Sequence, residues 1–248
     1  MKGVILAGGR ATRLHPLTTV TNKHLLPLYN EPVIYHPIRK LVAAGIEKIM
    51  IVSSPRQIEH FVNLLGSGEG FHPRGKPDKQ IQIVYAIQNE PRGIAQGLWL
   101  AKDYVGSDNV VLCLGDNIIE DDITNAVEGF TDGATVFLKE VADPMRFGIA
   151  VLDEAGHVVE ILEKPSHDAG TLAVVGAYVY DNTVFEKLVG QPLSERGEYE
   201  ITYINNLYAK EKRLRAVHLK EPWFDVGTFD SLLEASHYMR EKHRKNNA

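Results

Sequence analysis

Residues 6–14 read Leu-Ala-Gly-Gly-Arg-Ala-Thr-Arg-Leu and begin at the end of an apolar run, Met1–Ala7. This run has no internal breaker and predicts a buried parallel strand that ends at Gly8. The paired glycines let backbone N–H groups approach an anion with no Cβ in the way, and Arg13 and Lys23 add positive charge. The stretch therefore predicts a phosphate-binding cradle, although a tight strand-to-loop turn would also use two glycines.

Length, composition and charge limit the class of protein. The chain has 248 residues, 44% hydrophobic and 24% charged, which is enough for one large domain or for one domain with a lobe. Its net charge of -5 is spread over the chain, and the basic cluster 240–245 is typical of a solvated helix end, so we expect no nucleic-acid partner. No apolar run reaches the ~18 residues of a membrane helix. With a single cysteine, Cys113, in an apolar segment, we expect a cytoplasmic protein without disulfides.

The first half of the chain alternates apolar strands with amphipathic helices. The expected strands are 1–7, 48–52, 81–86 and 110–114, and the expected helices are 32–44, 57–65 and 94–104. This pattern predicts a doubly wound parallel sheet with helices on both faces, which binds ligands at the carboxyl ends of its strands. Gly8 and Asp116 both fall at such ends.

The second half is richer in strands. The expected strands are 135–141, 148–152, 157–162, 173–180 and 215–219, and the expected helices are 183–189, 200–211 and one that starts at an N-cap, Thr228, and reaches Lys242. This composition predicts a mixed-sheet extension. We expect a single domain over 1–248, with a nucleotide-binding core over about 1–120 and a sugar-phosphate-binding part with closing elements over about 121–248.

Short motifs continue along the whole chain after the glycine loop. They are Gly115-Asp116-Asn117, Phe147-Gly148, Glu163-Lys164-Pro165, Val175-Gly176-Ala177-Tyr178, Arg196-Gly197-Glu198-Tyr199-Glu200-Ile201-Thr202 and Trp223-Phe224-Asp225-Val226-Gly227-Thr228. In order and spacing they resemble the sugar-phosphate nucleotidyltransferase family. The resemblance implies a doubly wound, mostly parallel, Rossmann-like α/β sheet with a mixed-sheet sugar-binding lobe. It also implies a short form that lacks the C-terminal extension of longer members.

The resemblance implies a reaction and a set of site residues. The reaction is transfer of a nucleotidyl group from dTTP to glucose 1-phosphate, which yields dTDP-glucose and pyrophosphate for nucleotide-sugar and cell-envelope polysaccharide synthesis. Catalytic cations are implied at Arg13, Lys23 and Lys164. The implied nucleotide-binding residues are Leu6, Gly8, Gly9, Arg10, Ala11, Thr12, Arg13, Gln88, Gly93 and Asp116. The implied sugar-phosphate-binding residues are Asn117, Gly148, Glu163, Lys164, Val175, Tyr178 and Trp223.

A magnesium ion is implied at Asp116 and Asp225. An aspartate after glycine often only makes a turn. The chemistry favours the metal, because a triphosphate brings magnesium with it and magnesium binds one or two carboxylates plus phosphate oxygens. The nucleophile needs no general base, since a phosphate monoester loses its second proton at a pKa of about 6.

Four positions depart from the family's usual pattern. His24 stands where glutamine is common, Tyr203 replaces a frequent aspartate, and Ala11 and Arg92 are the other two. Ala11 stands where glycine is common, so the loop either avoids a positive φ there or carries strain of roughly 1 kcal/mol. Arg92 precedes Gly93 where small or acidic residues are common, which bears on the choice of nucleotide.

Alternative functions differ in what they require of the sequence. A uridylyltransferase that uses UTP and a hexose 1-phosphate would share all these motifs. A nucleotide-sugar-binding sensor would keep the pocket and lose the metal ligands or cations, which are present here. A dinucleotide-dependent oxidoreductase would need Gly-x-Gly-x-x-Gly and an acid after the second strand, where this chain has Ser53 and Ser54. The expected partners are small-molecule substrates and further copies of the chain in a homo-oligomer.

Overall fold

The computed structural model describes residues 1–9 and 11–247, and its main feature is one large twisted β-sheet. The expected strands are confirmed to within one or two residues at their ends. The strands of this sheet are β1 (Lys2–Leu6), β4 (Lys48–Ser53), β5 (Gln82–Ile87), β6 (Val110–Leu114), β8 (Ala134–Glu140), β9 (Gly148–Leu152), β10 (Val158–Glu163), β11 (Leu172–Tyr180) and β12 (Leu214–His218).

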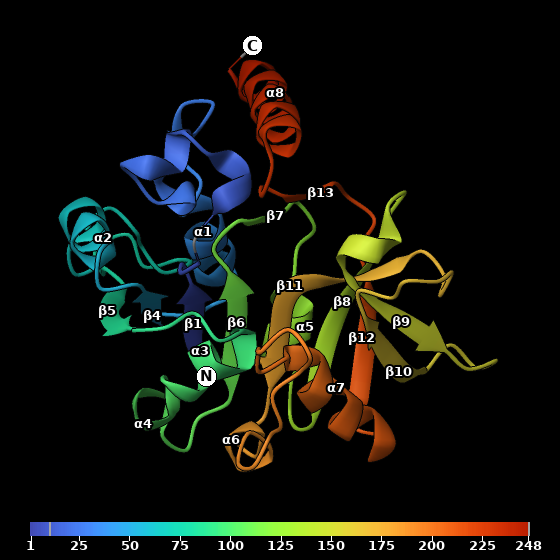
Figure 1. The fold of residues 1–248 in the computed structure, drawn as a ribbon. Coiled ribbons are helices and arrows are strands. Elements are labelled where there is room, and N and C mark those ends of the chain that lie inside the picture. The colour runs from blue at the N-terminus through green and yellow to red at the C-terminus, as the bar shows by residue number, and fades with distance from the viewer. Residues whose placement is uncertain (10, 248) are drawn as a thin grey trace.

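The sheet is parallel in its first half and mixed in its second. β1 lies between β4 and β6 and is parallel to both, and β4 pairs in parallel with β5. β11 pairs antiparallel with β6 and carries the sheet on into β8, β9 and β10, so the two halves share one continuous sheet (Figure 1). The expected Rossmann-like sheet with a mixed extension is confirmed.

Helices cover both faces of the sheet because successive strand residues point to opposite sides. The helices are α1 (Tyr35–Ala43), α2 (Ile58–Leu65), α3 (Ile94–Trp99), α4 (Lys102–Val105), α5 (Thr124–Glu128), α6 (Val184–Lys187), α7 (Ile201–Lys210) and α8 (Phe229–Asn246). Val4 packs into a core with α3, α6 and α7, whereas its neighbour Ile5 packs into a second core with α1, α2 and α5.

One predicted helix is wrong as a continuous element. The expected helix over 94–104 is split into α3 and α4, because the amide of Ala101 bonds to the carbonyl of Leu98, three residues back, and ends the first segment. The final helix begins where expected. Thr228 caps α8 by accepting from the amide of Ser231, and the helix continues past Lys242 to Asn246.

Two short ribbons were not predicted. β7 (Asn117–Ile119) pairs antiparallel with β13 (Trp223–Asp225), and β2 (Pro27–Leu28) pairs with β3 (Glu31–Pro32). The β7–β13 ribbon lies beyond the carboxyl end of β6, between the sheet and α8 (Figure 1). It joins the two halves of the chain at the edge where ligands are expected.

Over residues 1–9 and 11–247, no helix is both long enough and apolar enough to cross a bilayer.

Candidate active site

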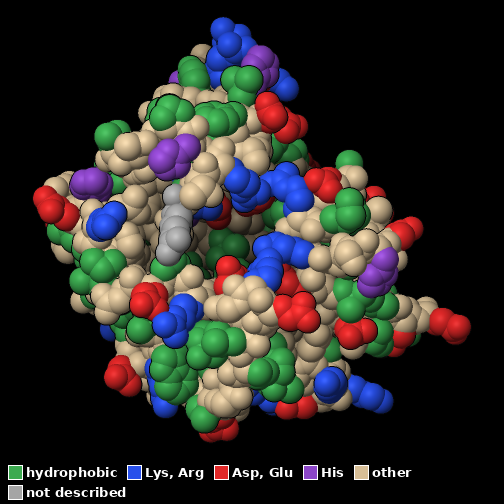
Figure 2. Space-filling model, viewed as in Figure 1, with side chains coloured by type: hydrophobic (Ala, Val, Ile, Leu, Met, Phe, Trp, Pro, Cys, Tyr) green, Lys and Arg blue, Asp and Glu red, His purple; other side chains and the backbone are tan. Residues whose placement is uncertain are grey.

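Two adjoining cavities open at the carboxyl ends of β1 and β6. The first has a volume of about 220 Å³ and the second of about 600 Å³. Figure 2 shows this face of the molecule, where Lys and Arg side chains gather around a central hollow and hydrophobic side chains show at its depth. Ile94, Leu114 and Glu198 line both cavities, so the two are neighbouring parts of one site.

The first cavity brings together most of the residues expected to bind the nucleotide. It is lined by Leu6, Gly8, Gly9, Lys23, His24, Gln88, Pro91, Gly93, Ile94, Leu114, Asp116 and Glu198. The side-chain oxygen of Gln88 faces Gly8, where an added Cβ would lie 3.1 Å from it. Its nitrogen donates to Gln96 Oε1 over 2.9 Å, which fixes the orientation of the amide.

The glycine loop leaves β1 through unusual backbone conformations. Gly9 has a φ of 96°, and Ala11 has a φ of 47° in the left-handed region. The strain expected for alanine at this position is therefore present. Arg10, between these two residues, lies outside the described part of the chain, and Thr12 is an exposed residue at the start of a 3-10 turn, Thr12–Leu14.

Lys23 and Asp116 form an ion pair at the boundary of the first cavity. Burial would raise the pKa of Asp116, but the charges and hydrogen bonds of its neighbours, with the Lys23 charge the largest of them, together outweigh burial and lower this pKa to about 2, so the carboxylate is ionised near neutral pH. Burial, together with the charge of Lys23, lowers the pKa of His24 to about 3. His24 is therefore neutral, and Lys23 is the cation that faces Asp116.

The second candidate carboxylate reaches the same place from the other half of the chain. The β7–β13 pairing puts Asp225 opposite Asn117, and the amide of Val226 donates to the carbonyl of Asp116 over 2.9 Å. Burial and the nearby charge of Asp116 raise the pKa of Asp225. Two carboxylates from distant segments thus lie near one another, Asp116 in the first cavity and Asp225 in the second.

Arginine side chains surround Asp225. Arg146 Nη2 lies 3.3 Å from Asp225 Oδ2. A Cβ added at Gly227 would lie only 2.8 Å from Nη2 of Arg13. The glycine therefore leaves room for the Arg13 side chain. Arg13 lines the second cavity, as Asp225 does.

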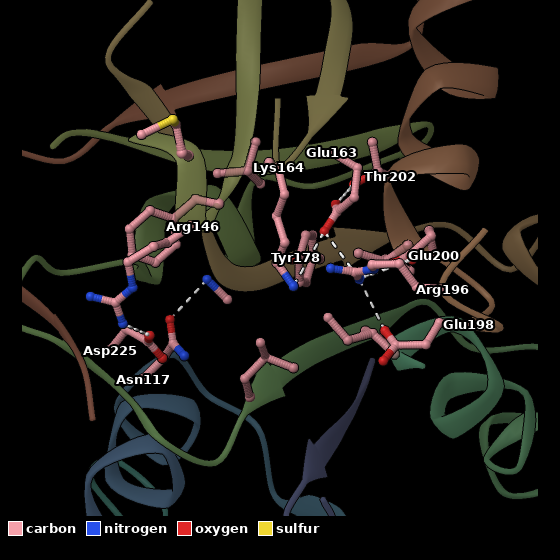
Figure 3. A pocket seen from close by; sticks show the side chains of 18 of the residues that line it. Asn117, Arg146, Glu163, Lys164, Tyr178, Arg196, Glu198, Glu200, Thr202 and Asp225 are labelled. Atoms are coloured by element: carbon pink, nitrogen blue, oxygen red, sulfur yellow. Dashed lines mark hydrogen bonds and ion pairs between the residues drawn. The ribbon is translucent and has the colours of Figure 1, made fainter. Parts of the chain in front are cut away.

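The far end of the second cavity is built around Glu163 (Figure 3). Its Oε2 accepts from Thr202 Oγ1 over 2.5 Å, and its Oε1 lies 3.8 Å from Lys164 Nζ and 3.5 Å from Arg196 Nη2. Lys164 has a φ of 43°, a left-handed conformation that is strained for a side chain with a Cβ. Strain of this kind is common in residues that a binding site holds in place.

The comparisons with known proteins agree with this geometry. The family described as nucleotidyl transferase matches residues 2–242. The chain belongs to the nucleotidyl transferase family. The nucleotidyltransferase is 40% identical over 245 residues to a glucose-1-phosphate thymidylyltransferase of Mycolicibacterium smegmatis, covering 97% of this chain and 82% of the relative.

Solved structures extend the likeness to the fold. A crystal structure from Bacillus anthracis, assigned as a glucose-1-phosphate thymidylyltransferase and determined in complex with a sucrose, superposes with a TM-score of 0.89 at 43% identity, over 97% of this chain and 95% of that one. A UDP-glucose pyrophosphorylase complexed with UDP-glucose has a TM-score of 0.85 over 97% of this chain and 98% of that one. At 22% identity it is similar in fold alone.

The residues expected at the sugar phosphate differ in where they lie. Gly148, Tyr178 and Trp223 line the second cavity of the nucleotidyltransferase, together with Glu163, Lys164 and Asn117. Val175 has its side chain in the core, and its neighbours Val174 and Gly176 face the cavity instead.

Five polar residues of the second cavity had no assigned role in the sequence prediction. They are Arg146, Arg196, Glu198, Glu200 and Thr202. Arg196 Nη2 lies 3.0 Å from Glu198 Oε2 and 2.9 Å from Glu200 Oε1, so several carboxylates surround its guanidinium. The motif over 196–202 had already indicated that this segment matters, but no comparable signal pointed to Arg146.

Proposed function

We propose that this nucleotidyltransferase transfers a thymidylyl group from dTTP to glucose 1-phosphate and so forms dTDP-glucose and pyrophosphate. The observation that carries the proposal is the junction of the two cavities, where Lys23, Asp116, Asp225 and Arg13 meet. A triphosphate in the first cavity and a sugar phosphate in the second would bring their phosphate groups to this junction. The named activity of the Mycolicibacterium smegmatis relative supports the same substrates.

The reaction needs alignment and charge neutralisation. An oxygen of glucose 1-phosphate attacks the α-phosphorus of dTTP, an O–P bond forms, and the bond to the bridging oxygen of pyrophosphate breaks with its electron pair. The nucleophile is largely an anion near pH 7, so no side chain has to remove a proton. Arg13 and Lys23 would stabilise the charge on the α-phosphate and on the leaving pyrophosphate, and Lys164 would hold the sugar phosphate.

The residues at the junction fit a magnesium ion bound together with the triphosphate. Magnesium takes one or two carboxylates and fills its other positions with water and phosphate oxygens. Asp116 and Asp225 supply two carboxylates, while the described residues 1–9 and 11–247 contain no cluster of three or more His, Cys, Asp or Glu side chains that could hold a metal by itself. When bound, the ion would neutralise phosphate charge during the transfer. Asp116 and Asp225 would orient it.

The two parts of the chain would bind different substrates. The nucleotide-binding core over about 1–120 supplies every lining residue of the first cavity except Glu198. The sugar-phosphate-binding part over about 121–248 supplies most of the second cavity, with Arg13, Ile94, Leu114 and Asn117 coming from the core. The reaction would take place in the cytoplasm. Exposed Phe229 and Leu233 on α8 are consistent with a homo-oligomer.

Pyrophosphate release tests the proposal directly. The purified protein is assayed with magnesium, with dTTP, UTP, CTP, ATP and GTP, and with glucose, galactose and mannose 1-phosphates. We expect dTTP with glucose 1-phosphate to give the highest kcat/KM. A higher kcat/KM with UTP would make the protein a uridylyltransferase. Tight nucleotide binding without any pyrophosphate release would make it a sensor.

A further inference from the structure

Arg146 makes a contact that the proposed chemistry does not use. Its Nη2 lies 3.3 Å from Oδ2 of Asp225, one of the two carboxylates proposed to hold the metal (Figure 3). The Arg146 side chain is 35% exposed and that of Asp225 is 19% exposed. The pair therefore lies inside the cavity mouth, partly shielded from water.

The local structure holds Arg146 in this position. It ends a 3-10 turn, Pro144–Arg146, immediately before β9. Its guanidinium carbon lies 5.4 Å from the centre of the Phe147 ring, and that ring packs against Trp223 with 5.1 Å between ring centres. Because Trp223 belongs to β13, the strand that also carries Asp225, the arginine and the carboxylate are fixed to the same ribbon.

The same arrangement occurs at the other carboxylate. Asp116 is paired with Lys23, as Asp225 is paired with Arg146. Two carboxylates that approach each other in a partly buried place repel unless cations compensate them. In the structure, Lys23 pairs with Asp116 and Arg146 pairs with Asp225, and Arg13 adds positive charge near Asp225.

We propose that Arg146 is a positioning residue that acts as an exchangeable counter-ion of Asp225 and competes with the divalent cation for this carboxylate. The inference rests on the proposed function, since it takes Asp225 as a metal ligand. Arg146 keeps Asp225 oriented while the metal is away. When the carboxylate turns to the metal, Arg146 is released to the phosphate groups in the second cavity, which it lines with Arg13 and Lys164.

This exchange would couple metal binding to substrate binding. Arg146 loses a carboxylate when the metal arrives, and it regains an anion only if a phosphate group is present in the cavity. The protein alone should therefore bind a divalent cation weakly, and a phosphate-bearing ligand should strengthen that binding.

Binding of Mn²⁺ to the protein without nucleotide tests the inference without relying on activity. Free Mn²⁺ is measured by electron paramagnetic resonance for the parent, Arg146→Met and Asp225→Asn. We expect Arg146→Met to bind Mn²⁺ about three- to tenfold more tightly than the parent, because a partly exposed ion pair no longer competes. Arg146→Lys, which keeps a cation, should stay within about twofold of the parent. A variant damaged in its structure would bind more weakly, not more tightly.

Lys164→Met is the matched control, because it removes one cation from the same cavity without a contact to Asp225. Equal tightening in Lys164→Met and Arg146→Met would overturn the inference, since the effect would then be one of net charge. Unchanged or weaker binding in Arg146→Met would overturn it as well, and so would Mn²⁺ binding that Asp225→Asn leaves intact. Pyrophosphate release by the parent is scored separately, so failure of the counter-ion role and failure of the proposed function are distinguishable.

Discussion

The indole nitrogen of Trp223 donates a hydrogen bond of 2.8 Å to Oδ1 of Asn117. The same oxygen accepts from the backbone amide of Gly176 over 3.0 Å, and the side-chain Nδ2 of Asn117 donates to Asp116 Oδ1 over 3.1 Å. Asn117 thus connects β11, β13 and the candidate metal ligand Asp116. This connection explains how Asp116 and Asp225, more than 100 residues apart in the sequence, are held at one point.

The two carboxylates should be required for turnover and not for folding. We expect Asp116→Asn and Asp225→Asn each to lower kcat by about 100-fold or more, because each removes charge from the proposed metal site with little change of volume. Turnover is measured as pyrophosphate release at saturating magnesium, and folding by thermal unfolding. Asp103→Asn, on the exposed surface of α4, is the control and should keep the parental rate. Near-parental rates in both site variants would contradict the metal assignment.

Lys23 and Lys164 should affect different steps. Lys23 lines the first cavity, so Lys23→Ala should slow the single-turnover rate with both substrates saturating more than it weakens sugar-phosphate binding. Lys164 lines the second cavity, so Lys164→Ala should mainly raise the KM for glucose 1-phosphate. If Lys23→Ala changed only the affinity for the sugar phosphate, Lys23 would be serving the other half of the site.

The parts of the fold with a local signal were predictable, and the parts made by distant contacts were not. The apolar run before Gly8 and the run before Asp116 predict buried strands by themselves, and both strands are present. β7 and β13 are three-residue strands that pair across the length of the second half, so no window of sequence predicts them. The helix break at Leu100 and Ala101 was missed because both residues favour helix and neither glycine nor proline marks it.

The candidate site was likewise predictable where a residue carries its own sequence signal, and not where distant segments come into contact. Gly8 and Asp116 could be assigned because they belong to recognisable motifs, Gln88 was implied by the family resemblance alone, and the structure brings all three into one cavity. Arg146 lies outside those motifs, and its relation to Asp225 exists only in three dimensions. For Ala11 the sequence left two alternatives, a loop that avoids a positive φ and a loop that is strained, and the structure has the second. The positive φ of Lys164 had no sequence signal.

The loop that holds Gly93 should couple the two substrates. Gly93 has a φ of 101°, and a Cβ there would lie 2.5 Å from the carbonyl oxygen of Tyr199, on the segment that carries Arg196 and Glu198. The two segments are joined by a hydrogen bond of 2.8 Å from the Tyr199 amide to the Arg92 carbonyl. We expect Gly93→Ala to raise the KM for dTTP and for glucose 1-phosphate together, each at least fivefold, a cost of roughly 1 kcal/mol.

Gly75→Ala is the matched control for Gly93→Ala. It also places alanine at a positive φ, 71°, but in the exposed loop 66–79 where the added Cβ meets no atom within 4 Å. Steady-state kinetics with each substrate varied in turn should leave both KM values of this control unchanged. An effect of Gly93→Ala on the dTTP constant alone would show that the two segments move independently.

Asp181 should stabilise the fold in a pH-dependent way. Its carboxylate accepts from the Gly133 amide, from Thr183 and from Tyr208, and it pairs with Arg213 at 2.6 Å. Burial would raise its pKa, but these hydrogen bonds and the Arg213 charge outweigh burial and lower it. A lowered pKa in the folded state gives stability above the unfolded pKa, about 3.9, that is lost as the pH falls through the folded value.

We therefore expect Asp181→Asn to lower the free energy of unfolding at pH 7 by about 1 to 3 kcal/mol. The difference from the parent should narrow as the pH falls below about 4. Urea unfolding from pH 7 down to the lowest pH at which the parent folds measures this. Asp78→Asn in the exposed loop 66–79 is the control. A difference that stays constant with pH would mean that the ionised form of Asp181 is not what stabilises the fold.

Gln88 should recognise the base of the nucleotide. The oxygen of Gln88 faces Gly8 in the first cavity, and one N–H of its amide is used by Gln96, which leaves an acceptor and a second donor. With the amide orientation fixed by Gln96, this pair matches the N3–H and O4 edge that thymine and uracil share, whereas cytosine, with its donor and acceptor exchanged, would need the amide to turn over. We expect dTTP to be the best substrate and CTP to be poor. UTP should also be accepted, because the one methyl group that distinguishes thymine from uracil is worth only about 1 to 3 kcal/mol in an apolar pocket.

The measurement is kcat/KM for dTTP, UTP, CTP and ATP with glucose 1-phosphate, in the parent, in Gln88→Ala and in Gln96→Leu. Gln88→Ala should lower kcat/KM for dTTP and UTP by about tenfold or more and leave the low values for CTP and ATP nearly unchanged, so that discrimination collapses. Gln96→Leu keeps Gln88 but frees its amide to rotate, and should lower discrimination by a smaller factor. An equal loss on every base in Gln88→Ala, or CTP that matches dTTP in the parent, would show that Gln88 does not recognise the base.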